Sequence, residues 1–490
     1  MAAAAARHAK PSCPTLLSLL LLLRMLLVEP AAGACSVDAI YSFGDSIADT
    51  GNLLREGPVG FFASIGSYPY GQTLRKPTGR CSDGLLIIDY FAMALNLSLV
   101  SPYMDKDADF ASGVNFAVAG ATALDRAVLL QGGVMMPPAS VPLSTQLEWF
   151  RSHLNATCAS QEDCAKKLAG ALFLVGEIGG NDYNYGFFQG IRSIEPMKTY
   201  VPQEVIELGA TQIIIPGNFP IGCSPSYLSL FSVSGTGDLD DRGCLKSYNA
   251  FAQHHNEQLQ AAIDDLRKAN TDVTIIYADY YGAFMHLLDH ASILGFEQDS
   301  LLQACCGAGG GYNFKMNLIC GAPGTNVCAN PARRVSWDGI HLTQQAYRAI
   351  ALSLLMEGFA QPADARLHPL ASSFHLHLIL PPYHVAGERQ KRGHVVPEHR
   401  TTEPAGADAA YKNVKVNLCY APVSQKDRRW CKSNDDLSKD KACQFNVTQQ
   451  AYVAGARSSF EYTVARDIPT GSYYVRAYTL DTSGTQVAYG

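Results

Sequence analysis

Three residue types that together support nucleophilic catalysis lie in two distant segments of the chain. Ser46 follows Gly44 and Asp45 directly after an apolar run, and Asp338 precedes His341 by three residues. A serine hydroxyl is a weak nucleophile at neutral pH, so it needs a base to take its proton and a carboxylate to orient that base. The Asp338-x-x-His341 spacing puts both side chains on one side of a turn, with one imidazole nitrogen free to face a serine. We therefore predict that Ser46, His341 and Asp338 form a catalytic triad.

Acyl transfer by such a triad also creates a negatively charged oxygen, which needs hydrogen-bond donors. Gly120 and Asn181 are candidates, because each follows a predicted strand. Two other groupings have weaker support. Glu177 and Asp182 are carboxylates close enough in sequence for a glycosidase pair, but only their proximity favours this interpretation. The glycine-rich residues 307–311 lack the Lys-Ser/Thr of a phosphate-binding loop, so they predict a flexible loop.

The elements that must position these residues alternate between two periodicities. Segments with helical spacing separate short apolar runs with β propensity, which are 39–43, 114–118, 171–175, 212–215 and 273–277. This alternation predicts a parallel sheet covered by helices, an α/β fold with its chemistry at the strand ends. The clearest helix spans 244–270, where we expect His254 and His255 on a partly exposed polar face. A last helix is predicted over 343–357.

The motifs Gly44-Asp45-Ser46, Gly120, Gly180-Asn181-Asp182 and Asp338-x-x-His341 together resemble those of the plant GDSL esterase/lipase family, part of the SGNH hydrolase superfamily. The resemblance covers about residues 36–360. It implies a flavodoxin-like three-layer α/β/α sandwich that hydrolyses carboxylic esters without metal or organic cofactor. The backbone N–H groups of Ser46 and Gly120 and the side chain of Asn181 would then form the oxyanion hole. Ile47 stands where the family name has Leu, which keeps an apolar side chain.

The carboxyl-terminal part has a different character. We interpret 366–401, rich in His, Pro and charge, as a disordered linker, and 402–490 as a partial all-β, immunoglobulin-like module. Residues 402–490 resemble the accessory proteins that activate high-affinity nitrate transporters, through Lys415 to Ser424 and Arg466 to Tyr478. That resemblance implies contact with a nitrate transporter. Two plant families in one chain suggest that parts of two neighbouring genes are joined.

The amino terminus and the cysteines predict export. Residues 1–34 have the order of a signal peptide, and Arg24 interrupts an apolar run too short for a membrane anchor. No later segment is apolar enough to span. Fourteen cysteines without a Cys-x-x-Cys pair fit an oxidising compartment and favour no metal site. Glycosylation sequons begin at Asn96, Asn155 and Asn446. We expect a secreted protein, extracellular or in the cell wall.

These observations predict a secreted serine ester hydrolase whose catalytic domain spans 35–365 and acts on small-molecule or lipid esters. The formal net charge of -6 argues against a nucleic-acid partner. Two alternatives remain open. The same triad would serve an acyltransferase if an alcohol replaced water as the acyl acceptor. If the first domain were inactive, the protein would instead act as a transport-accessory or interaction protein.

Overall fold

The computed structural model describes two separate regions of the 490-residue chain. The first covers residues 37–58, 60–137, 141–191, 206–207, 209–232, 237–356 and 358–362; the second covers 392–395, 412–420, 441–452, 460–463 and 473–489. The predicted signal peptide, and all of the predicted linker except 392–395, lie outside the described residues.

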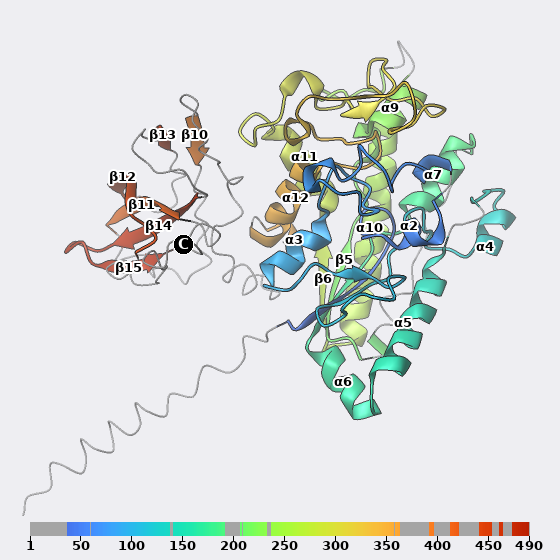
Figure 1. Cartoon of the computed structure of the whole chain (residues 1–490), viewed down its shortest axis with the longest axis horizontal. Helices are drawn as coiled ribbons and strands as arrows, with labels where there is room; N and C mark the ends of the chain where they lie inside the picture. Colours follow the sequence, from blue (N-terminus) through green and yellow to red (C-terminus); the bar gives the residue numbers. More distant parts are fainter. Residues whose placement is uncertain are drawn as a thin grey trace, which may run out of the picture.

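A seven-stranded sheet forms the centre of the first region (Figure 1). Its strands pair in parallel, except that the last two are antiparallel. In spatial order they are β2 (Ser101–Pro102), β3 (Gly113–Asn115), β1 (Ala39–Phe43), β4 (Ala171–Val175), β5 (Gln212–Pro216), β6 (Thr274–Ala278) and β9 (Ala360–Gln361). A small antiparallel pair, β7 (Cys306–Gly307) with β8 (Asn326–Val327), lies outside this sheet.

The order of the five central strands determines where a ligand site is expected. Numbered along the chain, β3, β1, β4, β5 and β6 give the spatial order 2-1-3-4-5, the flavodoxin-like arrangement. The chain adds β3 on one side of β1 and then β4 on the other side, so the sheet has its topological switch point between β1 and β4. In such folds, ligands bind outside the carboxyl ends of the strands at that point. Ser46 follows β1, and Asn181 follows β4.

Alternating side chains of the strands build a hydrophobic core on each face of the sheet. Ile40, Leu174 and Ile276 face one cluster, whereas Tyr41 and Phe173 face the other. The first cluster is covered by α3 (Ile87–Ala94), α11 (Tyr280–Asp289) and α12 (Gln344–Met356); the second by α5 (Leu143–Thr157), α6 (Gln161–Ala169) and α10 (Lys246–Ala269). Figure 1 shows α3, α11 and α12 on one side of the strands and α5 on the other. The predicted three-layer α/β/α sandwich is therefore confirmed.

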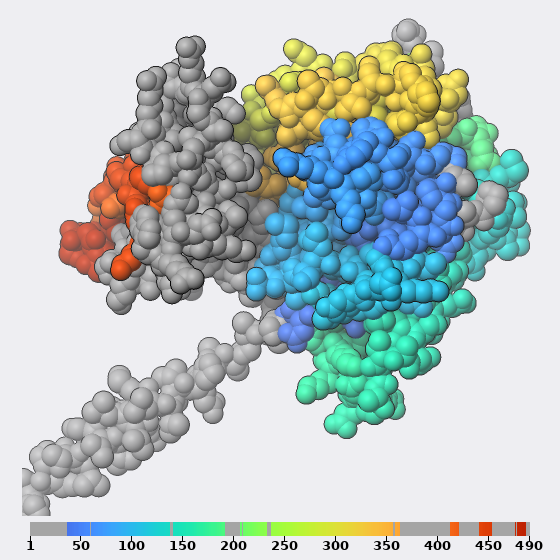
Figure 2. Space-filling view, in the orientation of Figure 1, coloured from blue at the N-terminus to red at the C-terminus, as the bar shows by residue number. Residues whose placement is uncertain are grey.

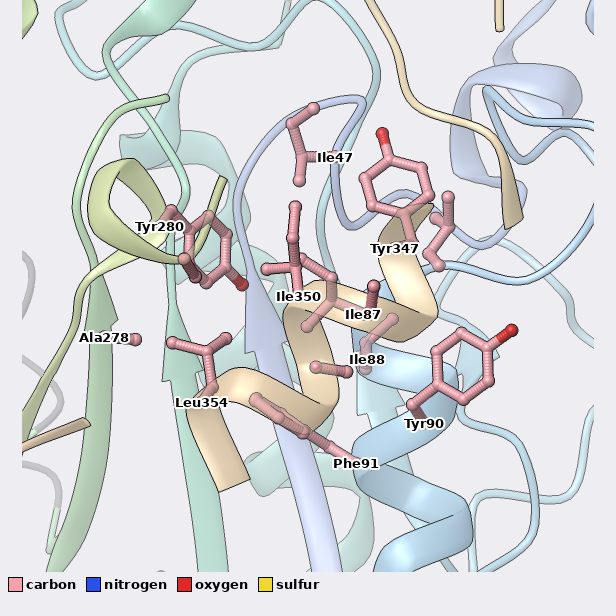
Figure 3. Packing of buried hydrophobic residues seen from close by; sticks show 14 of the residues in the cluster. Ile47, Ile87, Ile88, Tyr90, Phe91, Ala278, Tyr280, Tyr347, Ile350 and Leu354 are labelled. Atoms are coloured by element: carbon pink, nitrogen blue, oxygen red, sulfur yellow. The ribbon is translucent and has the colours of Figure 1, made fainter. Parts of the chain in front are cut away.

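The cover on the first face is close packed. Figure 3 shows Ile87, Ile88 and Phe91 of α3 beside α12, and Leu354 of α12 directed toward Ala278 of β6. The other α-helices that the structure describes in this region are short: α2 (Asn52–Glu56), α4 (Arg126–Gln131), α7 (Gly180–Phe188) and α9 (Pro225–Phe231).

Two predicted elements are shorter in the structure. The run 114–118 is a strand only over β3, because the Asn52 side chain bonds the carbonyls of Asn115 and Ala117, both at 2.8 Å. The N–H groups of Phe116 and Val118 still donate to the carbonyls of Ser42 and Gly44, at 2.7 and 3.1 Å. The predicted helix 244–270 begins at Lys246, since Leu245 N–H is bonded to the Gly222 carbonyl at 2.9 Å. The predicted helix over 343–357 corresponds to α12.

The second region is all-β, as predicted. β11 (Asn413–Tyr420), β12 (Phe445–Ala451), β14 (Tyr473–Leu480) and β15 (Gln486–Tyr489) form an antiparallel sheet in the order β12-β11-β14-β15. Cys419 and Cys443 are joined by a disulfide. A separate pair joins β10 (Arg392–Val395) to β13 (Phe460–Thr463). β10 lies inside the range 366–401, which we interpret from the sequence as a linker.

Within the described ranges of both regions, no helix combines the length and the apolar character needed to cross a bilayer.

Candidate active site

The turn after β1 fixes Ser46 at the carboxyl end of the sheet. Gly44 has φ +145°, and a Cβ on it would lie 2.9 Å from the Glu177 carbonyl oxygen, so only glycine fits without strain. The Gln146 amide bonds both the N–H and the carbonyl of Gly44, at 2.9 and 2.8 Å. Asp45 Oδ1 accepts the Ile47 N–H at 2.9 Å, which closes the turn around Ser46. Ile47 itself packs in the core, as expected (Figure 3).

A second turn, just before α12, holds Asp338 and His341. Asp338 Oδ1 accepts the backbone N–H groups of Ile340 and His341 at 3.0 and 2.8 Å. Gly339 has φ +99°, and a Cβ there would meet Phe314 at 2.3 Å. Trp337 N–H donates to the His341 carbonyl at 2.7 Å. The sequence spacing thus folds into a tight loop with both side chains on one side.

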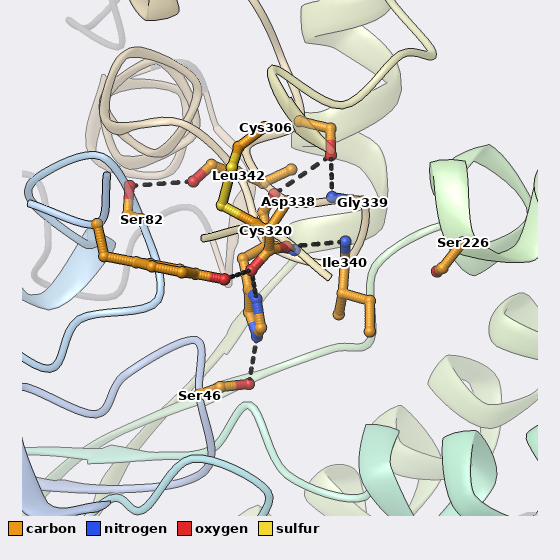
Figure 4. Close-up of polar contacts among 12 residues, drawn as sticks. Ser46, Ser82, Ser226, Cys306, Cys320, Asp338, Gly339, Ile340 and Leu342 are labelled. Carbon is orange, nitrogen blue, oxygen red and sulfur yellow. Dashed lines mark hydrogen bonds and ion pairs between the residues drawn. A yellow bond between two sulfur atoms is a disulfide. The ribbon is translucent and has the colours of Figure 1, made fainter. Parts of the chain in front are cut away.

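The two turns meet in a continuous hydrogen-bonded chain of side chains. His341 Nδ1 lies 2.7 Å from Asp338 Oδ2, and His341 Nε2 lies 2.7 Å from Ser46 Oγ. Figure 4 shows the Ser46 hydroxyl and the Asp338 carboxylate on opposite sides of the imidazole. All three side chains are buried. The structure therefore brings together residues that are 295 positions apart, in the arrangement predicted from sequence.

Asp338 lies in surroundings that favour its charged form. Burial by itself raises a carboxyl pKa, but the adjacent His341, with its charge and hydrogen bonds, lowers the pKa of Asp338 below its usual value. The Tyr70 hydroxyl donates a further hydrogen bond to Asp338 Oδ2 at 2.8 Å. Sequence reasoning missed Tyr70, since no spacing links it to the Asp338 loop.

The predicted oxyanion donors lie in segments that are bonded to one another and to the Ser46 turn. Asn181, in the first turn of α7, donates through Nδ2 to Asp45 Oδ2 at 2.9 Å and to the Ala121 carbonyl at 3.0 Å. Gly120 has φ +83°, and its carbonyl accepts from the Tyr185 hydroxyl at 2.8 Å. The three segments that carry Ser46, Gly120 and Asn181 are therefore directly connected.

Two buried aspartates, Asp49 and Asp182, hold this arrangement. Asp49 accepts the backbone N–H groups of residues 51–53 and that of Ala119, at 2.6–3.1 Å, so it ties the Ser46 turn to the Gly120 loop. Asp182 accepts the N–H groups of Ala123 and Leu124 at 2.8 and 3.0 Å. Burial raises the pKa of Asp182 to about 7. Asp182 thus supports the Gly120 loop, with both carboxylate oxygens bonded to its backbone.

Hydrogen bonds from Ser82 and Asp83, together with two disulfides, hold the His341 loop in place. Ser82 Oγ donates to the Leu342 carbonyl at 3.1 Å, and Asp83 Oδ1 accepts the Gln344 N–H at 2.7 Å. Figure 2 shows the blue amino-terminal segment in contact with the yellow segment on the visible face. Disulfides join Cys305 to Cys328 and Cys306 to Cys320, and Cys306 N–H donates to the Trp337 carbonyl at 2.7 Å. The glycine-rich residues 307–311 lie within the loop that these bridges close.

A cavity of about 760 Å³, including the open space at its mouth, reaches Ser46. Its walls are mostly apolar and include Phe219, Tyr227, Phe284 and Leu301. Polar groups gather near Ser46, among them Glu177, Asn181 and Asn218. A mostly apolar cleft with a few polar groups beside a nucleophile suits a small organic ester.

The other residues singled out from sequence lie away from this cleft or differ from expectation. Asn96, Asn155 and Asn446 of the sequons are all exposed. The expectation for His255 was wrong: it is buried in α10 and bonded to the Tyr183 hydroxyl at 2.8 Å, because it faces α7, and burial lowers its pKa to about 4. Among the residues that the structure describes, no group of three or more His, Cys, Asp or Glu could hold a metal ion.

Comparison with known proteins agrees with this geometry. Residues 40–354 match the model of the GDSL-like lipase/acylhydrolase family. The chain belongs to this family. Acetylajmalan esterase 2 of Rauvolfia serpentina is 47% identical over 333 residues, which are 66% of this chain and 90% of that relative. Sinapine esterase of Brassica napus is 44% identical over 339 residues, 66% of this chain and 87% of that relative.

The predicted resemblance and enzyme class are thereby confirmed: the GDSL part of the chain is an ester hydrolase. Residues 386–490 separately match the model described as high-affinity nitrate transporter accessory, Ig-like domain. That match begins before residue 402 and includes β10.

Proposed function

We propose that this ester hydrolase uses Ser46 as nucleophile, His341 as general base and acid, and Asp338 as the carboxylate that orients the imidazole. The observation that carries the proposal is the hydrogen-bonded chain from Ser46 Oγ through His341 to Asp338, with 2.7 Å at both links. This geometry meets the requirement that nucleophile, base and orienting group lie within hydrogen-bond reach of each other.

In the first half of the reaction, Ser46 Oγ attacks the ester carbonyl carbon while His341 Nε2 takes the hydroxyl proton. The tetrahedral intermediate then collapses, the carbon–oxygen bond to the alcohol breaks, and His341 returns the proton to the leaving alcohol. In the second half, His341 takes a proton from water as the water oxygen attacks the acyl-Ser46 carbonyl. Release of the acid and return of the proton to Ser46 complete the cycle.

We further propose that the backbone N–H groups of Ser46 and Gly120 and the Asn181 amide stabilise the oxyanion. The Asn181 amide hydrogens are donated to Asp45 and to the Ala121 carbonyl. An oxyanion therefore has to draw one of these hydrogens away from its present acceptor. Because that exchange gains most when a full negative charge develops, it favours the transition state over the bound ester.

The direct test is hydrolysis of a short p-nitrophenyl ester by Ser46→Ala. Loss of nearly all turnover is expected, because the variant lacks the attacking oxygen. Ser152→Ala is a matched control, since Ser152 is an exposed serine on α5 whose hydroxyl donates to the Glu148 carbonyl of its own helix. Undiminished turnover by Ser46→Ala would refute the assignment.

We propose that the protein is secreted, to the extracellular space or the cell wall, with residues 1–34 removed and Asn96, Asn155 and Asn446 glycosylated. Five disulfides among the described residues support an oxidising compartment. The exposure of all three sequon asparagines supports glycosylation. A mass decrease on treatment with an N-glycosidase is the expected result for the secreted protein.

For the carboxyl-terminal region we propose contact with a high-affinity nitrate transporter, supported by the family model that matches residues 386–490. The test is co-purification of such a transporter with the full chain and with a chain that ends after residue 365. Recovery of the transporter with the full chain only is expected. Equal recovery with both chains would contradict this role.

A further inference from the structure

Two residues that line the cavity beside Ser46 each carry a buried polar atom whose hydrogen bonding is incomplete. In the part of the chain that the structure describes, Glu177 Oε1 and Asn218 Nδ2 have no hydrogen-bond partner. Both residues line the cavity, with only 5% and 4% of their surface exposed. Buried polar groups in native proteins nearly always have partners, because an unpaired group loses its bonds to water without replacement. Two such atoms, on residues that line the same substrate cavity, therefore point to a ligand group that completes them.

The backbone around each side chain is fixed. The Asn218 N–H donates to Asn256 Oδ1 at 2.7 Å, and Asn256 Nδ2 donates to the Asn218 carbonyl at 3.0 Å. The Glu177 carbonyl accepts the Asp45 N–H at 3.2 Å, which places Glu177 next to the Ser46 turn. Side chains mounted on a fixed backbone can select a ligand group by position as well as by chemistry.

The chemistry of the two atoms favours an uncharged ligand group with both a donor and an acceptor. Asn218 Nδ2 can only donate, so it requires an acceptor and disfavours a cation. Glu177 Oε1 is an acceptor. Burial, with the nearby Asp45 and Asp182, raises the pKa of Glu177 well above its usual value, which favours its neutral, protonated form. A hydroxyl group meets both demands, since its oxygen accepts and its hydrogen donates.

We propose that Glu177 and Asn218 form a polar subsite that binds hydroxyl groups of the ester substrate. The inference rests on the proposed function of Ser46, because it assigns the selectivity of that same cleft. The apolar walls, such as Phe219 and Phe284, would hold the carbon skeleton. The enzyme would therefore prefer esters whose acyl or alcohol part carries a hydroxyl group over isosteric esters with a methyl group in its place.

The test compares kcat/KM for matched ester pairs that differ by one hydroxyl. In the alcohol part the pairs are 2-hydroxyethyl with propyl acetate, and 4-hydroxybutyl with pentyl acetate. In the acyl part the pair is ethyl 3-hydroxybutyrate with ethyl 3-methylbutyrate. We expect at least about a tenfold preference for the hydroxyl ester in one or more pairs, since a site built to bond a hydroxyl rejects the analogue that lacks it. Glu177→Gln should keep the preference, whereas Glu177→Leu and Asn218→Leu should reduce it to near one.

Three results would overturn the subsite. The first is a ratio near one in every pair for an enzyme that hydrolyses the esters, which would leave the proposed function intact. The second is an unchanged preference in the folded leucine variants. The third is a larger preference for acetylcholine over its neutral isostere 3,3-dimethylbutyl acetate than for any hydroxyl ester, which would indicate a cation site.

A binding measurement separates failure of the subsite from failure of the catalytic proposal. The shift in the thermal unfolding of full-chain Ser46→Ala is measured with each pair of esters. A larger shift with the hydroxyl ester supports the subsite even if the native enzyme hydrolyses none of the esters. Equal shifts in all pairs, together with no hydrolysis, would overturn both proposals.

Discussion

At the scale of single residues, the Asp338 carboxylate receives more hydrogen bonds than its role toward His341 requires. Its Oδ1 accepts two backbone N–H groups, and its Oδ2 accepts from both His341 and Tyr70. Every one of these bonds favours the ionised form, which opposes the effect of complete burial. The carboxylate is thus fixed in place and charge, and it fixes the imidazole in turn.

Tyr70→Phe tests this positioning, because it removes one hydroxyl and leaves the buried ring. We expect kcat to fall about tenfold, equal to about 1.4 kcal/mol, with little change in KM. Tyr90→Phe is the control, because the Tyr90 hydroxyl bonds to the Gln344 carbonyl at 3.3 Å and not to Asp338. Equal kcat values for both variants would contradict the positioning role of Tyr70.

Glu177→Gln makes a prediction about stability against pH. The raised pKa means that folded Glu177 keeps its proton at pH values where the unfolded chain, with an ordinary value of 4.5, has lost it. The native protein should therefore lose stability relative to the variant as pH rises above 4.5, by about 1.4 kcal/mol per pH unit until the folded group ionises. Urea unfolding of both proteins at several pH values measures this. Parallel stability curves would show that Glu177 is ionised in the folded state.

At the scale of elements, the loop that carries Asp338 and His341 depends on its disulfide-bridged neighbour. The N–H groups of Cys305 and Cys306 donate to the carbonyls of Ser336 and Trp337 at 2.9 and 2.7 Å, directly before Asp338. Two short strands and two disulfides thus hold the residues that directly precede Asp338.

Replacing both Cys306 and Cys320 by alanine should make the residues before Asp338 more mobile. Closure of such a loop is worth about 3 kcal/mol, and we expect kcat to fall at temperatures where the rest of the fold is intact. The control replaces Cys158 and Cys164, which bridge the segment between α5 and α6. The measurement is kcat per folded molecule for each double variant, with the folded fraction taken from its melting curve. An equal effect of both double variants would contradict a specific role of the Cys306–Cys320 disulfide in holding the loop of Asp338 and His341.

The predictable part of the site lies at the ends of elements, where sequence patterns mark the strands. Ser46 and Asn181 follow apolar runs that became β1 and β4, and their chemistry was legible from residue type. Tyr70 was not predictable, since it is one of 24 tyrosines and lies in an irregular segment. Gln146 and Asn218 likewise act through contacts made only after folding. The shortening of β3 had no sequence signal either, because the Asn52 side chain that bonds two carbonyls of this run is distant in sequence.

At the scale of the whole molecule, the described residues that build the site all belong to the first region. The family model ends at residue 354, and Acetylajmalan esterase 2 matches 66% of this chain. We therefore expect a chain that ends after residue 365 to hydrolyse a p-nitrophenyl ester with a kcat/KM within about twofold of the full chain. A large loss of activity in a chain that still melts cooperatively would mean that the carboxyl-terminal region contributes to the site.

The central claim is that the acyl group passes through Ser46. It is tested most directly by mixing the full chain with p-nitrophenyl acetate, quenching with acid during the first turnovers, and locating the acetyl group by peptide mass spectrometry. We predict acetylation of the Ser46 hydroxyl, together with a burst of p-nitrophenol equal to the enzyme concentration, and neither result in Ser46→Ala. An acetyl group on another residue during turnover, or the same burst from Ser46→Ala, would contradict the claim.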